Sequence, residues 1–485
     1  MAVQSAELYA ITTKQAEKNV RNLQRRLVKA ATVRDTKLVK KLIRLMLHSY
    51  SCKVVAVEQV TRKNKGKNTA GVDGITITTD QERLIAVSRK YQRVRKYPVK
   101  RVYIPKKNGK QRPLGIPTVS ERIQQKIHQL IMEPLYSVWG SRNSYGFRPG
   151  RCTRDCLEIM WLCTGTTQGK RILIDGDIQG CFDNISHDTL MELLDPYTLP
   201  VMKEQIWLSL KSGAIDKGVK INTNSGTPQG GVSSPLLANI ALSILDTAME
   251  KMINPRRKTK KQPLSGYVRF ADDFVAILDN ENHAEIVIGK IKDALIPLNL
   301  KLNMEKVKVV EIEDGLKFLG YHIRRYPTGK VHVGIPREST KEIVTKIKDI
   351  FRKHRNNKQS TLIEELNPVI NGWANYYRWT RAGKTYCKLD SWLWYKTWRW
   401  ALRRHPKKSR KWIAHKYYRK IGNRKWVFTC EDENGKAIVL SLFCRKYSEI
   451  YPKLNRNKNY FIDETYFNQL KSRRSWKKEI KNNVA

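Results

Sequence analysis

The sequence predicts an α+β fold, in which a sheet of antiparallel strands carries helices on one face. Apolar runs at residues 172–174 and 274–278 each adjoin a group of carboxylates, and residues 97–117 read as two strands joined by a turn. Near Arg337 the pattern changes, and apolar residues recur at helical spacing to about residue 420. Because strands and helices do not alternate regularly, the order favours an α+β arrangement.

Basic helices are expected near the N-terminus, over residues 13–60. Their pattern consists of leucines at roughly helical spacing among lysines and arginines: Leu23, Leu27, Leu38, Leu42 and Leu45. A β-ribbon follows, with strands at 101–105 and 112–115 around a turn at Lys107-Asn108-Gly109. Helical patterns then continue to about residue 165.

A hairpin with two carboxylates at its tip is predicted at Phe270-Ala271-Asp272-Asp273. Residues 266–269 read as one strand and residues 274–278 as its antiparallel return. Two adjacent buried anions are costly unless a hard cation neutralises them. An Asp-Asp pair can also be a simple turn signal, so the hairpin needs a partner before it indicates a metal site.

That partner is the segment 171–183, where a second apolar strand ends in carboxylates. A two-metal site for nucleotidyl transfer needs ligands from separate strands, and Asp177 with Asp272 and Asp273 would supply them. Asp175 and Asp183 are alternatives to Asp177, and spacing does not choose among them.

The composition indicates a nucleic-acid partner. Lys and Arg total 93 against 44 Asp and Glu, a formal charge of +49 spread along the 485 residues. The sequence contains no run of 18 apolar residues, so no membrane span is predicted, and the N-terminus lacks the pattern of a signal peptide. The eight cysteines contain no C-x-x-C pair, which fits a reducing cytosol. No transit peptide is visible, so the expected location is a bacterial cytoplasm, in association with nucleic acid.

An all-helical region is expected after Arg337. Ser339-Thr340-Lys341-Glu342 reads as a capping box, and Ile343, Ile347, Ile350 and Phe351 would form the apolar side of the helix that it opens. The aromatic residues that follow are typical of a bundle core, with a base-stacking platform as the alternative. They are Trp373, Tyr376, Tyr377, Trp379, Trp392, Trp394, Trp398, Trp400 and Trp412.

Taken together, these motifs resemble the group II intron-encoded reverse transcriptases, also called maturases, and they arrive in the order of that family. The motifs are TAGVDG (69–74), IPKKNGKQRPLGIPT (104–118), SYGFRP (144–149), the Asp177 segment, GTPQGGVSSPLLANI (226–240), FADD (270–273), LNMEK (302–306), FLGY (318–321) and NPVINGWANYY (367–377). The last of these looks like the maturase thumb, or X domain, and separates this family from retroviral, retron and telomerase relatives.

The resemblance implies a right-hand polymerase with fingers and an antiparallel palm sheet. The expected domains are a basic helical extension at 1–75, fingers and palm at 76–335, an all-helical thumb at 336–420, and a basic DNA-binding region at 421–485. This last region and residues 401–420 together carry 23 Lys and Arg against 7 Asp and Glu.

The resemblance selects Asp177, Asp272 and Asp273 as catalytic metal ligands. It also implies that the backbone carbonyl of Ile178 faces a metal, while the Ile178 side chain packs in the strand. The expected cofactor is Mg²⁺ as two ions, with Mn²⁺ as a substitute.

Five further residues match nucleotide-binding positions of the family. Lys106 and Arg112 would meet the triphosphate, Phe182 would exclude a ribose 2′-hydroxyl, Gln229 would border the pocket, and Lys306 would serve the departing pyrophosphate. Without the family context, each has an ordinary interpretation: hairpin charges in solvent for Lys106 and Arg112, strand-end packing for Phe182, a plain turn for Gln229, and a surface lysine for Lys306.

Two departures from the family pattern matter. Phe270 replaces the tyrosine of the usual YADD box, which removes a hydroxyl next to the primer end but keeps both carboxylates. After Trp426 no histidine and no C-x-x-C pair follow, so an HNH nuclease domain is not expected. Such a protein would prime DNA synthesis from a nascent strand or from a break.

The function implied by the resemblance is that of an RNA-directed DNA polymerase and maturase. It would bind group II intron RNA to promote splicing and copy that RNA into cDNA during retrohoming, with target DNA and dNTPs as further partners. A splicing-only maturase with weak polymerase activity and a domesticated reverse transcriptase are the alternatives.

Overall fold

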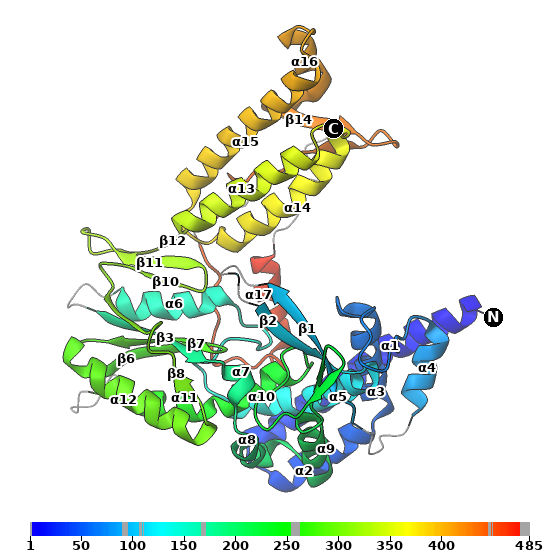
Figure 1. Cartoon of the computed structure of the whole chain (residues 1–485), viewed down its shortest axis with the longest axis vertical. Coiled ribbons are helices and arrows are strands. Elements are labelled where there is room, and N and C mark those ends of the chain that lie inside the picture. The colour runs from blue at the N-terminus through cyan, green and yellow to red at the C-terminus, as the bar shows by residue number, and fades with distance from the viewer. Residues whose placement is uncertain are drawn as a thin grey trace. The chain divides into compact units, whose positions relative to one another are not determined.

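The computed structural model describes residues 2–89, 96–105, 109, 111–165, 171–253, 262–444, 448 and 450–475, with only the backbone for residues 2–12. The chain forms two compact units (Figure 1). The first comprises residues 1–163, 169–309 and 455–467, and the second comprises 164–168, 310–454 and 468–485. The fold is α+β, as the sequence predicts.

The first unit begins with helices α1 (Ala2–Thr32), α2 (Thr36–His48), α3 (Tyr50–Glu58), the π-helical turn η1 (Gln59–Lys63) and α4 (Asp80–Ser88). Asp35 caps α2, because its side chain accepts a hydrogen bond from the backbone N–H of Leu38 at 2.9 Å. Leu27 and Leu42 are buried, whereas Leu38 and Leu45 are 37% and 49% exposed. The leucine spacing therefore predicted the helices, but only some of the leucines belong to the core.

The predicted β-ribbon is confirmed as β1 (Val99–Pro105) and β2 (Gln111–Ile116), which pair antiparallel. β1 also pairs in parallel with β4 (Ala214–Asp216), and β4 pairs antiparallel with β5 (Val219–Ile221). This gives a four-stranded sheet in the order β2-β1-β4-β5.

Helices between the strands supply most of the core of the first unit. They are α5 (Val119–Trp139), α6 (Thr153–Thr164), α7 (Cys181–Asn184), α8 (His187–Leu193), α9 (Pro200–Leu210), α10 (Ser234–Ala241), α11 (Ser243–Lys251) and α12 (Ala284–Leu295), with 3₁₀ turns η2 (Asp195–Tyr197), η3 (Glu281–His283) and η4 (Ile296–Leu298). Buried residues of α1, α2 and α5 join those of the central sheet in one hydrophobic cluster.

The central sheet has the order β6-β7-β3-β8, with β9 also paired to β3. Its strands are β6 (Leu264–Phe270), β7 (Asp273–Leu278), β3 (Ile172–Gln179), β8 (Lys301–Leu302) and β9 (Lys308–Glu311). The hairpin β6–β7 and its antiparallel pairing with β3 match the predicted strands.

Helices cover both faces of this sheet, so the expectation of helices on one face was wrong. A Cβ at Gly266 would meet the Sγ of Cys163 on α6, and the next residue, Tyr267, donates a hydrogen bond to Asp246 on α11. Successive residues of a strand point to opposite faces. The reason lies in β7, where residues 274–278 are all buried and need cover on both sides.

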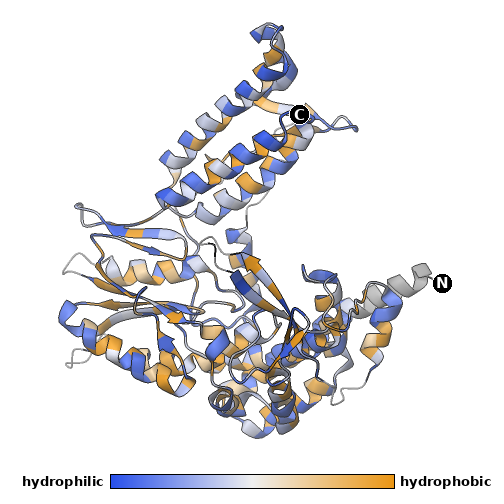
Figure 2. Cartoon of the chain, viewed as in Figure 1, coloured by the Kyte–Doolittle hydropathy of each residue, from blue (hydrophilic) through white to orange (hydrophobic). Residues whose placement is uncertain are grey.

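The second unit contains the antiparallel strands β10 (Leu316–Phe318), β11 (Tyr321–Arg325) and β12 (Val331–Gly334), the helices α13 (Arg337–Lys353), α14 (Gln359–Tyr377), α15 (Gly383–Arg404) and α16 (Arg410–Tyr417), and the strands β13 (Tyr418–Ile421), β14 (Arg424–Glu431) and β15 (Ala437–Val439). Helix α17 (Glu464–Arg474) follows. Figure 2 shows hydrophilic and hydrophobic residues alternating along α13 and α15, which is typical of helices with one buried side.

The predicted capping box at Ser339 was wrong. Helix α13 begins at Arg337 with Pro336 as its N-cap and no side-chain cap, so Ser339 already lies in the first turn. Proline fixes the backbone φ and can start a helix without a capping hydroxyl. The apolar positions hold, because Ile343, Ile347 and Ile350 are buried.

The chain beyond residue 420 is divided between the two units. Gln359 of α14 donates hydrogen bonds to the carbonyls of Tyr417 and Thr429, at 3.0 and 3.1 Å, so the β13–β15 sheet belongs with the helices. Residues 455–467 return to the first unit, where Glu464 pairs with Arg21 at 3.2 Å. Residue 420, the predicted end of the thumb, lies inside β13.

Across the described residues, the structure contains no helix that is both long and apolar enough to cross a membrane. All eight cysteines are free thiols.

Candidate active site

Two strands of the central sheet bring three carboxylates to one place. Asp177 of β3 lies directly opposite Asp273 of β7 in their antiparallel register. Residues directly opposite in such a pair share a face of the sheet, with Cβ atoms about 5 Å apart. Asp272 precedes Asp273 on the turn that joins β6 to β7. Phe270, opposite Asp273 in the hairpin, lies on the same face.

The turn that carries Asp272 has an uncommon backbone conformation. Ala271 adopts a φ of +60°, which non-glycine residues rarely take. Gly146 lies directly against it, since a Cβ at Gly146 would stand 2.4 Å from the Ala271 nitrogen. The backbone N–H of Tyr145 donates to the carbonyl of Arg269 at 2.8 Å. The SYGFRP segment therefore packs against the carboxylate turn and supports it.

A buried arginine fixes the same turn. The Arg269 side chain is fully buried, and its Nη1 donates to the Ala271 carbonyl at 2.8 Å and to the Asn239 side chain at 3.0 Å. Its Nε and Nη2 donate to the two carboxylate oxygens of Asp246 at 2.7 and 2.6 Å, and Nη2 also donates to Ser144 Oγ at 3.1 Å. A buried ion pair of this kind is tolerable because every donor is satisfied.

Two carboxylates at the site, those of Asp272 and Asp273, have a raised pKa. Burial raises the pKa of Asp273 to about 7, and the charges of Asp272, Asp177 and Asp175 add to the shift. Burial also raises the pKa of Asp272, and the charge of Asp177 contributes. The positive charges of Arg112 and Lys306 act on Asp272 in the opposite direction. A divalent cation would relieve this repulsion.

Asp177 is held by two residues of the LNMEK segment. Lys306 Nζ lies 2.7 Å from Asp177 Oδ2, and the Asn303 amide donates to the same oxygen at 3.2 Å. The backbone N–H of Asn303 donates to the Asp177 carbonyl at 2.9 Å. The hydrogen bond to Asp177 raises the pKa of Lys306, whose side chain is 63% exposed. Lys306 is therefore an exposed cation directly beside the carboxylates.

The two alternatives to Asp177 occupy different places. Asp175 lies opposite Val275, two residues further into the sheet and on the same face as Asp177. Burial raises its pKa to about 6. Asp183 lies on α7 and accepts hydrogen bonds from Gln229 Nε2 at 3.2 and 3.4 Å. Only Asp177 stands opposite the Asp272–Asp273 turn, although Asp175 is close enough to act on Asp273 electrostatically.

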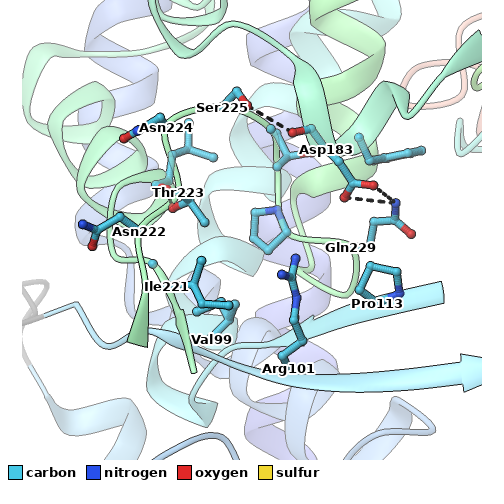
Figure 3. A pocket seen from close by; sticks show the side chains of 18 of the residues that line it. Val99, Arg101, Pro113, Asp183, Ile221, Asn222, Thr223, Asn224, Ser225 and Gln229 are labelled. Atoms are coloured by element: carbon cyan, nitrogen blue, oxygen red, sulfur yellow. Dashed lines mark hydrogen bonds between the residues drawn. The ribbon is translucent and has the colours of Figure 1, made fainter. Parts of the chain in front are cut away.

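A cavity of about 220 Å³ lies between the β-ribbon and the GTPQGG loop (Figure 3). Gln229 lines the cavity and is hydrogen-bonded on both sides: its Oε1 accepts from Arg112 Nε on β2 at 2.8 Å, and its amide donates to Asp183 at 3.2 Å. Arg101 and Pro113 line the ribbon side, and Ser225 donates to the Asp183 carbonyl at 3.2 Å.

The other predicted residues are placed as follows. Phe182 lines this cavity and packs partly on the hydrophobic core. The Ile178 side chain is buried in that core, opposite Leu302. Lys106 lies outside the described residues.

The donor set suits a hard cation, since it offers carboxylate oxygens from two strands. Among the residues that the structure describes, no three His, Cys, Asp or Glu side chains converge closely enough to enclose a metal ion. Asp177 is paired instead with Lys306, whose Nζ lies 2.7 Å from its carboxylate. The chemistry of these oxygen donors fits a hard cation, and their assignment as metal ligands stays a prediction.

Sequence reasoning missed the residues that support the site. Arg269 and Asp246 lie far apart along the chain, and their ion pair, with both side chains buried, is visible only in the folded structure. Asn303 stood in a recognised motif without an assigned role. One available signal was Arg269 itself, a charge inside an apolar strand that must find a buried partner.

Three family models match successive parts of the chain. They are the N-terminal domain of reverse transcriptase over residues 9–89, the reverse transcriptase (RNA-dependent DNA polymerase) over residues 104–323, and the group II intron maturase-specific domain over residues 340–418. The reverse transcriptase match includes both β3 and the β6–β7 hairpin.

Two curated proteins and one solved structure are also similar to this chain. Protein YkfC of Escherichia coli is 31% identical, and the match covers 69% of this chain and 97% of that protein. The group II intron-encoded protein LtrA of Lactococcus lactis is 30% identical over 55% of this chain, so this chain spans about half of LtrA, 54% of its length. A telomerase structure from Candida tropicalis matches with a TM-score of 0.40 and 14% identity, covering 63% of this chain and 57% of the other.

Proposed function

Because this chain belongs to the group II intron-encoded reverse transcriptases that carry a maturase domain, we propose that it synthesises DNA on an RNA template at the Asp177–Asp273 strand pair. The observation that carries the proposal is the register of β3 and β7, which sets Asp177 opposite Asp273 beside Asp272. The same chain would promote splicing by binding its intron RNA. Target DNA and dNTPs are the further proposed partners.

Asp177, Asp272 and Asp273 would hold the metal, together with the Ile178 carbonyl. When bound, two Mg²⁺ ions supply Lewis-acid stabilisation of the attacking 3′-oxygen and of the departing pyrophosphate. Arg269 and Gly146 contribute by keeping the Asp272–Asp273 turn in place, so that little reorganisation is needed when substrate binds.

Basic and aromatic residues around the carboxylates would position the nucleotide. Arg112 is exposed and already hydrogen-bonded to Gln229, so its guanidinium is oriented for a phosphate. During the reaction, Lys306 would leave Asp177 and pair with the negative charge of the departing pyrophosphate. Phe182, in the cavity wall, would stand against a ribose 2′-hydroxyl and favour deoxynucleotides.

RNA binding is proposed from charge and from the maturase-specific segment. The net charge of +49 gives a strong, salt-dependent attraction to phosphates. Recognition of folded RNA depends mostly on shape and phosphate contacts. A splicing-only maturase is the second candidate, favoured by Phe270 in place of the tyrosine of the family motif.

The test is primer extension by the full chain on poly(rA)/oligo(dT) with Mg²⁺. Wild type is expected to make cDNA, and Asp272→Ala with Asp273→Ala is expected to make none. Asp293→Ala is the matched control, because Asp293 is an exposed helix carboxylate in a 3.5 Å surface pair with Lys290. If wild type makes no cDNA, the polymerase proposal fails.

A splicing assay with the intron RNA that encloses the reading frame separates the two activities. The double aspartate variant is expected to promote splicing as wild type does. If only splicing is seen, in wild type and in the variant alike, the splicing-only maturase is the correct assignment.

A further inference from the structure

The aromatic residues of the second unit divide into a buried group and an exposed group. Trp400 is 6% exposed and packs edge-on against Tyr417 and Phe428, at ring-centroid distances of 5.6 and 5.9 Å. By contrast, Trp394 is 42% exposed and Trp426 is 48% exposed. The interpretation as a bundle core therefore holds for Trp400 but does not account for the exposed rings.

The exposed rings of Trp394 and Trp426 lie in one cluster with the half-buried Trp398 and the buried Tyr418, where α15 meets the β13–β14 hairpin. Trp394 and Trp398 are near-parallel, with ring centroids 6.1 Å apart and planes 8° apart. Trp426 stands edge-on to both, at 6.4 and 5.8 Å, and lies 5.9 Å from Tyr418. We call these four rings, with the basic residues Arg419, Lys420 and Lys425, the aromatic cradle.

The backbone of the hairpin is distorted at the cradle. Trp426 has a φ of +59°, a conformation that is an outlier for a bulky side chain. The pairing of β13 with β14 shifts register between Arg419 and Ile421. Bulges of this kind redirect side chains. At this distortion the Trp426 side chain is half exposed to solvent.

The positive charge around the aromatic cradle indicates an anionic ligand. An open depression of about 440 Å³ beside Trp426 is lined by Arg419, Lys420, Lys425, His415, Tyr418 and Ala414. No carboxylate occurs in this lining as the structure describes it. A flat aromatic surface next to exposed cations is the combination that stacks an unpaired base and neutralises its phosphates.

We propose that the aromatic cradle binds an unpaired nucleobase of single-stranded nucleic acid by stacking on Trp426, with Lys420 and Lys425 on the neighbouring phosphates. The inference deepens the proposed RNA-binding function and rests on it. Intron RNA and single-stranded target DNA offer the same base and phosphate, and the experiment distinguishes these two sources.

The test uses the full chain with a fluorescein-labelled single-stranded RNA of ten mixed nucleotides, and with the matching DNA. Fluorescence anisotropy measures affinity, and 5-iodouracil photocrosslinking with mass spectrometry locates the contact. Trp426→Ala is expected to weaken binding roughly 5- to 100-fold and to abolish the adduct at the cradle. Trp426→Phe is expected to recover most of the affinity, because it keeps an aromatic face. The tighter of the two oligonucleotides identifies the natural source.

A second variant tests the cations of the cradle and leaves its aromatic packing unchanged. Lys420→Gln with Lys425→Gln changes only exposed side chains and is expected to lower the slope of log affinity against log salt by about 1.4. Trp161→Ala, on α6 and 38% exposed, is the matched control and should change neither adduct nor affinity.

Unchanged affinity and crosslinking in both cradle variants would overturn the proposal. So would a wild-type dimer in sedimentation velocity that Trp426→Ala dissociates, because the cradle would then dock a second copy. Primer extension is measured in parallel. Loss of cDNA with an intact cradle adduct refutes the polymerase alone, and cDNA without the adduct refutes the cradle alone.

Discussion

Replacing Arg269 with methionine is expected to loosen the central hairpin far more than a surface change would. The substitution removes a fully buried guanidinium and its five hydrogen bonds, and it leaves the Asp246 carboxylate, itself 1% exposed, with the Tyr267 hydroxyl at 3.1 Å. Removing one partner of a buried ion pair costs about 3–5 kcal/mol, because the other charge stays buried. The carbonyl of Ala271 also loses its donor, so the carboxylate turn should shift.

Hydrogen exchange followed by mass spectrometry measures this cost locally. Peptides covering β6 and β7 report the opening free energy of the hairpin. A loss of about 3–5 kcal/mol corresponds to exchange faster by roughly two to four powers of ten. Primer extension by Arg269→Met should fall with it, because Asp272 is no longer held in place.

A control variant and a double variant test whether the effect comes from the buried charge. Arg352→Met removes an exposed arginine that pairs with Asp349 at 3.2 Å, and it should change stability by less than about 0.5 kcal/mol. Adding Asp246→Leu to Arg269→Met should restore part of the lost protection, since no buried charge remains. If Arg269→Met leaves exchange in β6 and β7 as slow as in wild type, the reasoning on this ion pair is refuted.

Three further outcomes are expected. Burial lowers the pKa of His128 to about 3, so the folded chain loses stability as the pH falls below the unfolded-state pKa of about 6.5. In denaturant titrations, His128→Gln should therefore lose about 2 kcal/mol less unfolding free energy than wild type between pH 7.5 and pH 5. An equal loss in both proteins would contradict this. Gly146→Ala should cost about 1–3 kcal/mol and lower the primer-extension rate, because its Cβ would meet the Ala271 backbone, whereas Gly289→Ala, with open space around its Cβ, should be neutral or stabilising in thermal unfolding. Lys306→Met should lower kcat on the order of 10²-fold in primer extension, with partial recovery in Lys306→Arg; equal kcat values would remove Lys306 from the reaction.

Local sequence patterns predicted the strands that matter most for the site. The ribbon at β1–β2 and the hairpin at β6–β7 each combine an apolar or β-branched run with a short polar turn, and that signal survives without tertiary information. Asp177 could be placed at the end of a strand. Its register against Asp273 depends on the pairing of β3 with β7, which spacing along the chain does not contain.

Features that depend on tertiary contacts were missed. The pair of Arg269 and Asp246 forms only after β6 packs on α11, and cover on both faces of the sheet follows from the burial of β7. The strands β13–β15 were not predicted, because β13 and the start of β14 are basic and β15 is only three residues long. The capping box failed for a local reason, since Pro336 starts the helix before Ser339 can cap it.

Binding of Mn²⁺, followed by electron paramagnetic resonance, tests the assignment of the three aspartates most directly. The full chain is titrated in the presence of template, primer and a non-hydrolysable dNTP, with Asp177→Asn and Asp272→Asn beside wild type. Each substitution is predicted to weaken Mn²⁺ binding by at least about tenfold, because each removes a charged donor from the set that meets across β3 and β7. Equal Mn²⁺ affinity in wild type and both variants would contradict the account.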